Sequence, residues 1–452
     1  EGVDIPAVNQ IIMLRPTQSA IIFVQQLGRG LRKHFGKEYL TVIDFIGNYS
    51  NNYLVPIALY GDRSYNKDTI RKMLNTGSSS IPGCSTVNFD RITKERIYRS
   101  IDQAQIRRFS DLKHDYQLLE YELGRAPMMM DFLDIGGREP YAFVDYSGSY
   151  YNFVKKADPD NADVLTKKEA DLLEFYSKEI LNGKRCEETV ILAMLLEKES
   201  ATRDEINNIM NNNYGFVIGE DTIVSAVRNL NGEFIKDAAA RKYGITHNID
   251  AASDIRMDGG HKEILKKSTL YKYLNDMIRY SFKRFKTDYD KTKYRNGFML
   301  YKKYSRRDVC RILNWDRNEE STIYGYRIKH NTCPIFVTYN KKEDISESTK
   351  YEDAFVNPYI FSWMTRSRVR LDSNEAIDIN NYKNSGLRIS LFIKKSDAEG
   401  SDFYYMGDVT PQSSSQEEIT GSGGIKLPIV NFKFAMHDEV EESMYNYLES
   451  SI

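Results

Sequence analysis

The chain has 452 residues, enough for two to four domains, and its 41% hydrophobic and 28% charged residues are ordinary for a soluble globular protein. Its 63 basic and 64 acidic residues leave a formal net charge of -1, so the overall charge gives no reason to expect that the chain binds nucleic acid. No apolar run approaches the roughly 20 residues of a membrane helix, so we expect no membrane partner. Four scattered cysteines without a CxxC pair favour buried thiols in the cytoplasm over disulfides or a metal site: Cys84, Cys186, Cys310 and Cys333.

The first 46 residues have the pattern of a strand, a helix and a second strand. Apolar, β-branched runs at 8–14 and 39–46 predict buried strands, and a helix should begin near Ser19. In such a unit the helix covers a parallel sheet. If the helix extends far enough, Arg29 and Arg32 share one face and can bind one anion together. A solvated helix end is the simpler alternative.

Two motifs in this unit resemble those of superfamily 2 helicases. Residues 2–6, GVDIP, look like motif V, and residues 25–32, QQLGRGLR, look like motif VI. The resemblance implies the second RecA-like domain of an ATPase that uses ATP with Mg²⁺. It implies that Arg29 and Arg32 are arginine fingers, which offset charge in phosphoryl transfer. The remaining motif residues would act beside them or couple nucleotide to nucleic acid: Gly2, Asp4, Gln25 and Gly28.

The other half of an ATP site is missing from the sequence. No GxxxxGK[ST] motif occurs, and no DExx box precedes motif V. We therefore expect this chain to be the C-terminal portion of a longer enzyme, inactive alone and with no cofactor bound.

Residues 61–290 are predicted to be a mostly helical coupling region. Helices at 187–196, 202–210 and 221–230, with a strand at 232–235, follow the order of a winged helix. The third of these helices carries Glu220, Asp221 and only Arg228. Because a helix in a major groove is normally far more basic, this favours protein packing over DNA reading.

Positive charge is concentrated between residues 279 and 307. Eleven Lys or Arg residues face only two acids there, and eight Phe or Tyr side chains lie among them. Cations beside aromatic rings are typical of a surface that binds phosphates and stacks on bases. The alternative is a solvated linker whose aromatic residues belong to the core.

The last third changes to a β pattern. Short strands are predicted at 324–328, 333–339, 387–393 and 403–407, with a flanking helix at 306–315. These elements suggest a curved, barrel-like domain over 291–452. The predicted fold is therefore multidomain: an α/β remnant of a RecA-like domain at 1–60, an α region with a winged-helix-like part near 187–235, and a β barrel with flanking helices.

Several C-terminal motifs resemble the region that follows the helicase core in SauUSI-like type IV, modification-dependent restriction enzymes. They are LYKKYSR (300–306), CPIFVTY (333–339), KYED (350–353), FSW (361–363) and FYYMG (403–407). The resemblance implies a nuclease, a helicase-type ATPase, a coupling region and an SRA-like domain that recognises 5-methylcytosine or 5-hydroxymethylcytosine in double-stranded DNA. Partners would be that DNA and the nuclease and helicase domains of the same protein, and a homodimer stays open.

A reader of this kind must extrude the modified base, which costs a few kcal/mol, and hold it in a pocket. The pocket needs aromatic plates and an acceptor for the cytosine N4 amine. Candidate plates and acceptors are Trp363, Tyr351, Tyr324, Tyr326, Tyr404, Asp353 and Glu352. Three arginines alternating along a predicted strand at 366–370 would face the DNA backbone. The backbone candidates are Lys302, Lys303, Arg306, Arg307, Arg366, Arg368 and Arg370.

Each candidate has a structural alternative, because Trp and Tyr are mostly core residues and same-face arginines can guard an edge strand. Three functions therefore stay open. The adopted interpretation is the target-reading and ATPase-coupling portion of an ATP-dependent restriction endonuclease. The second is a β domain that binds RNA or DNA without regard to modification, in a helicase. The third is a structural role in docking partners.

Overall fold

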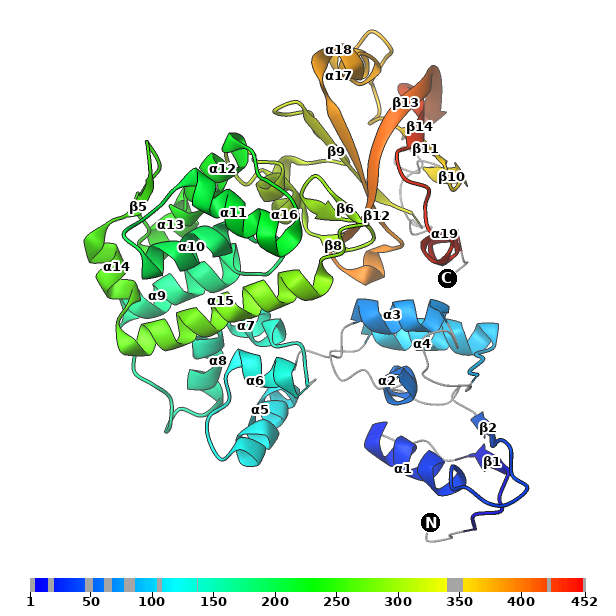
Figure 1. The fold of residues 1–452 in the computed structure, drawn as a ribbon. Helices are drawn as coiled ribbons and strands as arrows, with labels where there is room; N and C mark the ends of the chain where they lie inside the picture. The colour runs from blue at the N-terminus through cyan, green and yellow to red at the C-terminus, as the bar shows by residue number, and fades with distance from the viewer. Residues whose placement is uncertain are drawn as a thin grey trace. The chain divides into compact units, whose positions relative to one another are not determined.

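The computed structural model describes residues 5–14, 20–44, 52–60, 67–76, 86–103, 108–135, 137–339, 353–420 and 424–449. The chain divides into two compact units (Figure 1). The first consists mainly of residues before 143, and the second contains residues 128–130 and 143–449.

The first unit begins with a strand, a helix and a parallel strand, as the sequence predicts. Strands β1 (Gln10–Met13) and β2 (Thr41–Asp44) pair in parallel, with Ile11 opposite Val42, and α1 (Ala20–Gly30) connects them. The prediction that both strands are buried is wrong, because Ile12 is 55% and Ile43 40% exposed. Side chains alternate across a strand, and these two lie on the face opposite the core.

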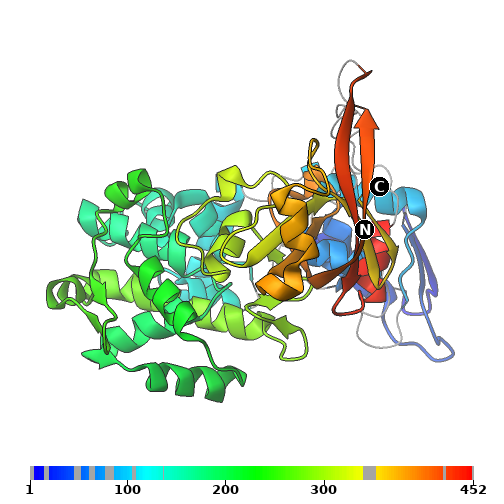
Figure 2. The same cartoon turned by 90° about the horizontal axis from the view of Figure 1, so that it is seen from above.

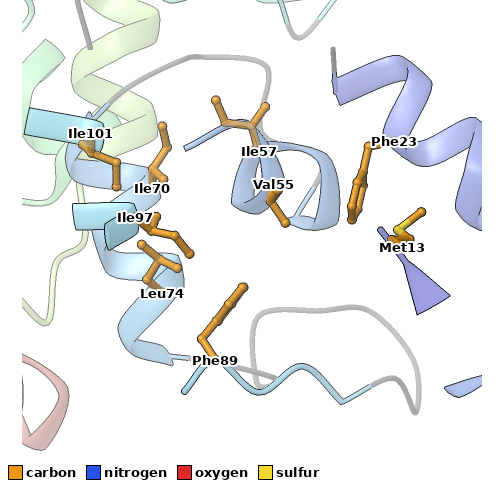
Figure 3. Packing of buried hydrophobic residues seen from close by; sticks show 9 residues of the cluster. All are labelled: Met13, Phe23, Val55, Ile57, Ile70, Leu74, Phe89, Ile97 and Ile101. Carbon is orange, nitrogen blue, oxygen red and sulfur yellow. The ribbon is translucent and has the colours of Figure 1, made fainter. Parts of the chain in front are cut away.

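A small apolar core holds this unit together (Figure 3). It joins the βαβ elements to α2 (Leu54–Tyr60), α3 (Lys67–Thr76) and α4 (Arg91–Gln103). The buried side chains are Met13, Phe23, Val55, Ile57, Ile70, Leu74, Phe89, Ile97 and Ile101. Then follow α5 (Phe109–Leu123), which ends at the left-handed Gly124, and α6 (Met129–Asp134).

The helical part of the second unit is built around the long helix α15 (Ser268–Asp288) (Figure 1). Two helices in it begin with reciprocal capping boxes, which satisfy otherwise orphaned backbone groups: Thr166 with Glu169 in α9, and Thr202 with Glu205 in α11. The other elements up to residue 186 are α7 (Tyr141–Ser147), α8 (Tyr150–Ala157), α9 (Lys167–Phe175) and the π-helix η3 (Tyr176–Ile180).

The segment that the sequence predicts to be winged-helix-like lies within this part. Three helices stand where the sequence predicts them: α10 (Glu187–Glu197), α11 (Arg203–Tyr214) and α12 (Glu220–Leu230). The strand predicted at 232–235 is absent; that stretch is a turn. Instead β3 (Ser200–Ala201), β4 (Ile249–Asp250) and β5 (Ile255–Met257) form a small sheet in the order β3-β5-β4. Helices α13 (Asp237–Tyr243) and α14 (Gly259–Leu265) complete the part.

The C-terminal part is a curled sheet with helices beside it, and Figure 2 shows a long β hairpin projecting from it. Its strands pair in the order β10-β11-β14-β13-β12-β9, and β8 pairs with β13. Most pairs are antiparallel, but β9 and β12 run parallel. The strands of the sheet are β8 (Lys303–Tyr304), β9 (Thr332–Thr338), β10 (Ala354–Asn357), β11 (Ile360–Met364), β12 (Arg388–Lys394), β13 (Phe403–Thr420) and β14 (Lys426–Met436).

Further short elements accompany the sheet. They are the hairpin of β6 (Tyr294–Arg295) and β7 (Phe298–Met299), helices α16 (Arg306–Ile312), α17 (Asn374–Asn380), α18 (Tyr382–Ser385) and α19 (Glu442–Glu449), and 3-10 turns η4 (Glu320–Thr322) and η6 (Asp397–Glu399).

Three predictions for this part need correction. Residues 324–328 form only isolated bridges, because the local turn at Gly325 interrupts a ladder. Residues 366–370 are a loop, since β11 ends at Met364. The strand predicted at 403–407 is too short, because β13 extends to Thr420.

Some absences can be stated for the described residues alone. No helix there is long and apolar enough to span a membrane. No group of three or more His, Cys, Asp or Glu side chains could hold a metal ion there. The three cysteines in that part of the chain, Cys186, Cys310 and Cys333, are buried thiols, and Cys84 lies outside it.

Candidate nucleic-acid interface

An aromatic cluster lies on the inner face of the C-terminal sheet. The Trp363 ring on β11 meets the Tyr326 ring edge-on, with centroids 4.9 Å apart, and packs on Phe432 and Phe434 of β14 at 5.9 and 5.6 Å. Trp363 is 3% exposed and Tyr326 2%. These two candidate plates are therefore core residues here, and a base could reach them only if neighbouring side chains moved.

The remaining candidates for the base pocket differ in exposure. Tyr404 is buried, with the Lys303 ammonium 4.7 Å from its ring centroid. Tyr324 is 71% exposed, in a turn where it forms an isolated bridge with Tyr326. Tyr351 and the acceptor candidate Glu352 lie outside the described residues. Only Tyr324 thus presents a ring to solvent among the described candidates.

Asp353 has a backbone partner. Its carboxylate accepts a hydrogen bond of 2.9 Å from the Met364 amide, and the residue is buried. An acid that holds the end of β11 has less capacity left for a ligand amine.

A polar group closes over the aromatic cluster. The Tyr326 hydroxyl donates to Glu375 of α17, and the Arg366 guanidinium pairs with the same carboxylate. The Arg366 guanidinium carbon also lies 4.6 Å from the Tyr326 ring centroid, within cation–π range. Burial, followed by the Glu375 interaction, raises the pKa of Tyr326. Arg366, a backbone candidate, is therefore held by an internal ion pair.

The loop between β11 and α17, residues 365–373, is pinned by hydrogen bonds. The Thr365 hydroxyl accepts from the Val430 amide at 2.9 Å, and the Arg368 amide donates to the Pro428 carbonyl at 2.7 Å. The Ser373 hydroxyl accepts from the Arg370 amide at 2.9 Å. Arg368 has a φ of +73°, a conformation rare for a residue with a Cβ, which these bonds maintain. The backbone of the loop is thus fixed before any ligand binds.

Two arginines of this loop are available for binding. Arg368 and Arg370 are exposed, and among the residues that the structure describes neither has an ion-pair partner. Lys426 and Lys433 on β14 are exposed as well. Because Arg368 bonds to Pro428, the loop lies against β14. We define the cationic loop as Arg368 and Arg370.

The segment 279–307 does not have the surface predicted for it. Five of its eight aromatic residues are buried: Tyr280, Phe285, Phe298, Tyr301 and Tyr304. Rings at less than a tenth exposure cannot stack on bases. The prediction of an aromatic, base-stacking surface is wrong for these five, and the core alternative describes them.

Most cations after residue 287 in this segment have internal partners. Lys302 pairs with Asp288, Lys303 with Glu399 and Arg307 with Glu179. Arg306 lies over the Phe336 and Phe403 rings, at 5.2 and 4.9 Å, and burial lowers its pKa. Lys293 and Arg295 pair with Glu441 and Asp438. All four backbone candidates at 302–307 therefore have structural contacts.

The third helix of the winged-helix-like part is covered by the C-terminal part. The α12 residue Thr222 accepts from Arg185 through its carbonyl at 3.0 Å, and its hydroxyl accepts from the Asn314 amide nitrogen at 3.1 Å. Arg228 pairs with Asp316 at 3.2 Å. A helix held in this way cannot lie in a major groove, which agrees with the packing role favoured by its acidic sequence.

Arg185 is the centre of this junction. It is 3% exposed, and its guanidinium donates to the Arg311 carbonyl at 2.6 Å and to Asn314 Oδ1 at 3.1 Å. Arg311 of α16 in turn donates to the Glu179 and Ile180 carbonyls, at 2.7 and 3.0 Å. Those carbonyls end the π-helix, where backbone acceptors lack helical partners.

An ion pair between the partly exposed Lys184 and the buried Asp308 strengthens the junction. Lys184 Nζ lies 2.9 Å from Asp308, and Asn182 donates to the other Asp308 oxygen at 2.9 Å. Burial alone would raise the pKa of Asp308, but Lys184, Arg311 and Arg307 hold it well below its usual range. The helical and C-terminal parts of the second unit are therefore joined by paired charges.

The arginine pair of the first unit lies at the end of α1. Gly30 is the last helical residue, so Arg32 lies beyond the helix and the two arginines do not share a helical face. Arg29 is exposed, as is Gly28. A Cβ at Gly30 would lie 2.3 Å from the Ile11 side chain, so the glycine permits close packing. Gly2, Asp4 and the Gln25 side chain lie outside the described residues.

The sequence alone did not indicate that two charged residues, Glu375 and Arg185, are central to these sites. Glu375 looked like an ordinary acid in a helical first turn, and Arg185 stood in the Asn182-Gly183-Lys184-Arg185 turn. Both become central only through contacts across 49 and 126 residues of chain. The tertiary partners of a single charged residue cannot be read from one sequence.

Two family models match the second half and middle of the chain. A "Domain of unknown function (DUF8090)" covers residues 112–289, and a "Domain of unknown function (DUF3427)" covers residues 298–448. One curated relative, the "Putative ATP-dependent helicase IRC3" of Saccharomyces cerevisiae, is 42% identical over 64 residues. That match is 14% of this chain and 9% of the relative, so the chain spans under a tenth of it. The chain is thus similar, over a short stretch, to a helicase-type protein.

Two solved structures of ScoMcrA also match at low similarity. The first is its sulfur binding domain and SRA domain complexed with phosphorothioated DNA, at 9% identity and a TM-score of 0.22 over 59% of this chain and 90% of that chain. The second is the type IV phosphorothioation-dependent restriction endonuclease, at 9% identity and a TM-score of 0.21 over 64% and 59%. Scores of this size do not establish a common fold.

Proposed function

We propose that this chain is the DNA-reading and ATPase-coupling portion of an ATP-dependent, modification-dependent restriction enzyme. In this proposal the C-terminal part binds double-stranded DNA, and it recognises 5-methylcytosine or 5-hydroxymethylcytosine. The observation that carries the DNA contact is the cationic loop: two exposed guanidinium groups on a backbone already fixed by hydrogen bonds. Because the backbone is already fixed, binding to phosphates orders only the two arginine side chains and not the loop.

The reading of a base would use the aromatic cluster beside that loop. Extrusion costs a few kcal/mol, and stacking on Trp363 or Tyr326 could offset it. Since both rings are buried, the Arg366–Glu375 pair over Tyr326 must separate for a base to enter. Tyr324, the exposed ring, could stack without such a change.

The coupling part of the proposal rests on the sequence motifs and the helicase-type relative. Arg29 is exposed at the end of α1, where a guanidinium could reach a nucleotide phosphate supplied with Mg²⁺ by another domain. The described residues of this unit offer a cation for that phosphate, while the sequence has no phosphate-cradling loop.

The burial of Trp363, Tyr326 and Tyr404 favours a second candidate function. In it, the cationic loop contacts the DNA backbone and the part binds any duplex, as an accessory of a helicase. Backbone contacts carry no information on base modification.

A titration of this chain separates the two. One fluorescent duplex is prepared unmodified, with 5-methylcytosine and with 5-hydroxymethylcytosine, and binding is measured at one salt concentration. The proposed reader binds a modified form at least about tenfold more tightly, about 1.4 kcal/mol. Trp363→Phe should keep that ratio and Tyr324→Ala should reduce it if the exposed ring holds the base. Equal binding of all three duplexes would reject the reader and leave the second candidate.

A further inference from the structure

Helix α15 carries a row of exposed cations that the proposed function does not use. It has 21 residues and is about 30 Å long at 1.5 Å per residue. Five Lys or Arg residues lie on it, and the structure assigns them to two groups. Lys272 pairs with Asp163 and Arg284 with Asp288, whereas Arg279, Lys283 and Lys286 are exposed.

The three exposed cations lie on one side of the helix. At 3.6 residues per turn, positions 279, 283 and 286 fall within about 60° of one another around the axis. The opposite side is packed into the core by Leu274, Met277 and Phe285. Within the described part of the chain, none of the three cations has an ion-pair partner. We call these residues the α15 row.

The acids of the same helix do not neutralise this row. Asp276 is buried, and its carboxylate accepts a 2.7 Å hydrogen bond from the Met129 amide. Asp288 is shared by Arg284 and Lys302. Both carboxylates of α15 therefore have partners within the fold, and no acid of this helix is left to pair with the α15 row.

The chemistry of the row favours a DNA backbone over a single strand of bases. Of the three aromatic side chains between the cations, Tyr280 and Phe285 are buried and Phe282 is only partly exposed, so the row offers mainly charge and little stacking surface. From 279 to 286 the row extends about 10 Å. One strand of a duplex carries about three phosphates over that length.

We propose that Arg279, Lys283 and Lys286 form a second contact to the phosphate backbone of duplex DNA, separate from the cationic loop. This inference rests on the proposed function for the presence of DNA, and it adds a binding surface on the helical part. The row would contribute to affinity independently of base modification, because it touches phosphates only.

The test compares salt dependence of binding for two triple variants of the whole chain. One variant is Arg279→Gln, Lys283→Gln and Lys286→Gln. The matched control removes three exposed cations elsewhere on the helical part, through Lys167→Gln, Lys168→Gln and Arg241→Gln. Each is titrated with modified and unmodified duplex from 50 to 200 mM salt, and circular dichroism confirms that each is folded.

The row variant should bind both duplexes at least about tenfold more weakly, with a log–log salt slope reduced by about 2 to 3, while the control stays within about twofold of the unaltered chain. If the row variant loses the same affinity for both duplexes, its ratio of affinities for modified and unmodified DNA is unchanged. That result supports the row for any value of the ratio. If the salt slope of the row variant equals that of the unaltered chain, or if the unaltered chain binds no duplex, the row is not a DNA contact. If the unaltered chain binds modified and unmodified duplex equally and the row variant still has a reduced salt slope, the recognition of modified bases is rejected while the α15 row is kept.

Discussion

The cations of the junction and those of the cationic loop have the same chemistry and opposite surroundings. Arg185, Arg311 and Lys184 are held by carbonyls, an amide and a carboxylate between the helical and C-terminal parts. Arg368 and Arg370 project from a pinned loop into solvent. The difference teaches that positive charge has a structural role where partners surround it, and is available for a ligand only where the fold leaves it exposed.

The largest effect should come from the centre of the junction. Arg185→Ala leaves the buried carboxylates Glu187 and Glu188 without their ion-pair partner and the Arg311 and Thr222 carbonyls without their donor, so we expect a loss of about 3 to 5 kcal/mol in the free energy of unfolding. Urea denaturation measures it. Arg256→Ala, which breaks an exposed pair with Asp254, is the control and should cost under about 1 kcal/mol. A loss below about 1 kcal/mol for Arg185→Ala would mean that the junction does not depend on it.

A pH effect should come from His261, which is buried beside the π-helix. Its ring nitrogen lies 2.9 Å from the Tyr176 hydroxyl, and burial lowers its pKa from 6.5 to about 4. Because the unfolded chain binds a proton more readily, this histidine stabilises the fold above pH 6.5, and that contribution is lost as the pH falls from 6.5 to about 4. Between pH 7 and 5 the loss should be about 2 kcal/mol. His261→Gln should remove this part of the pH dependence; identical profiles for both proteins would contradict it.

For the exposed arginines of the cationic loop we predict an effect on DNA binding without an effect on the free energy of unfolding. Arg368→Gln with Arg370→Gln should weaken duplex binding about tenfold and reduce the salt slope by about 2, because two phosphate contacts are lost. The free energy of unfolding should stay within about 0.5 kcal/mol. Fluorescence titration and urea denaturation on the same samples measure both. Unchanged binding would remove the cationic loop from the interface.

The smallest effect is expected from paired cations near the same sheet. Lys293→Gln with Arg295→Gln removes as much charge as the loop variant, but these residues already neutralise Glu441 and Asp438. Duplex affinity should therefore change by less than about twofold at fixed salt, with a stability cost under about 1 kcal/mol. A tenfold loss of binding here would show that bulk charge, rather than exposure, decides affinity.

Much of the fold follows from local sequence signals. The pattern of 8–46 predicts β1, α1 and β2, because β-branched runs and a helical period are local properties. Capping residues such as Thr202 mark the start of α11 in the same way. The prediction of a strand at 232–235 was wrong, because the small sheet instead pairs β5 with its neighbour β4 and with the distant β3, and pairing with a distant strand has no local signature.

The candidate sites were harder to predict, since they depend on which charges meet. The sequence shows that eleven cations lie at 279–307, but it does not show which of them are paired. Their acidic partners, Glu179, Glu399, Asp438 and Glu441, are known only from the structure. Trp363 and Tyr326 were chosen as rings that could hold a base, and their mutual contact at 4.9 Å now makes them core. The roles of Arg29 and Arg32 in ATP hydrolysis stay a proposal.

Arginine-selective labelling with phenylglyoxal, with and without a modified duplex, tests the central distinction most directly. Mass spectrometry then reports the reactivity of each side chain. We predict that DNA protects Arg368 and Arg370, whereas the internally paired Arg295 and Arg307 react slowly in both states and change little. Protection confined to other arginines, with Arg368 and Arg370 equally reactive in both states, would contradict the assignment of the cationic loop to DNA.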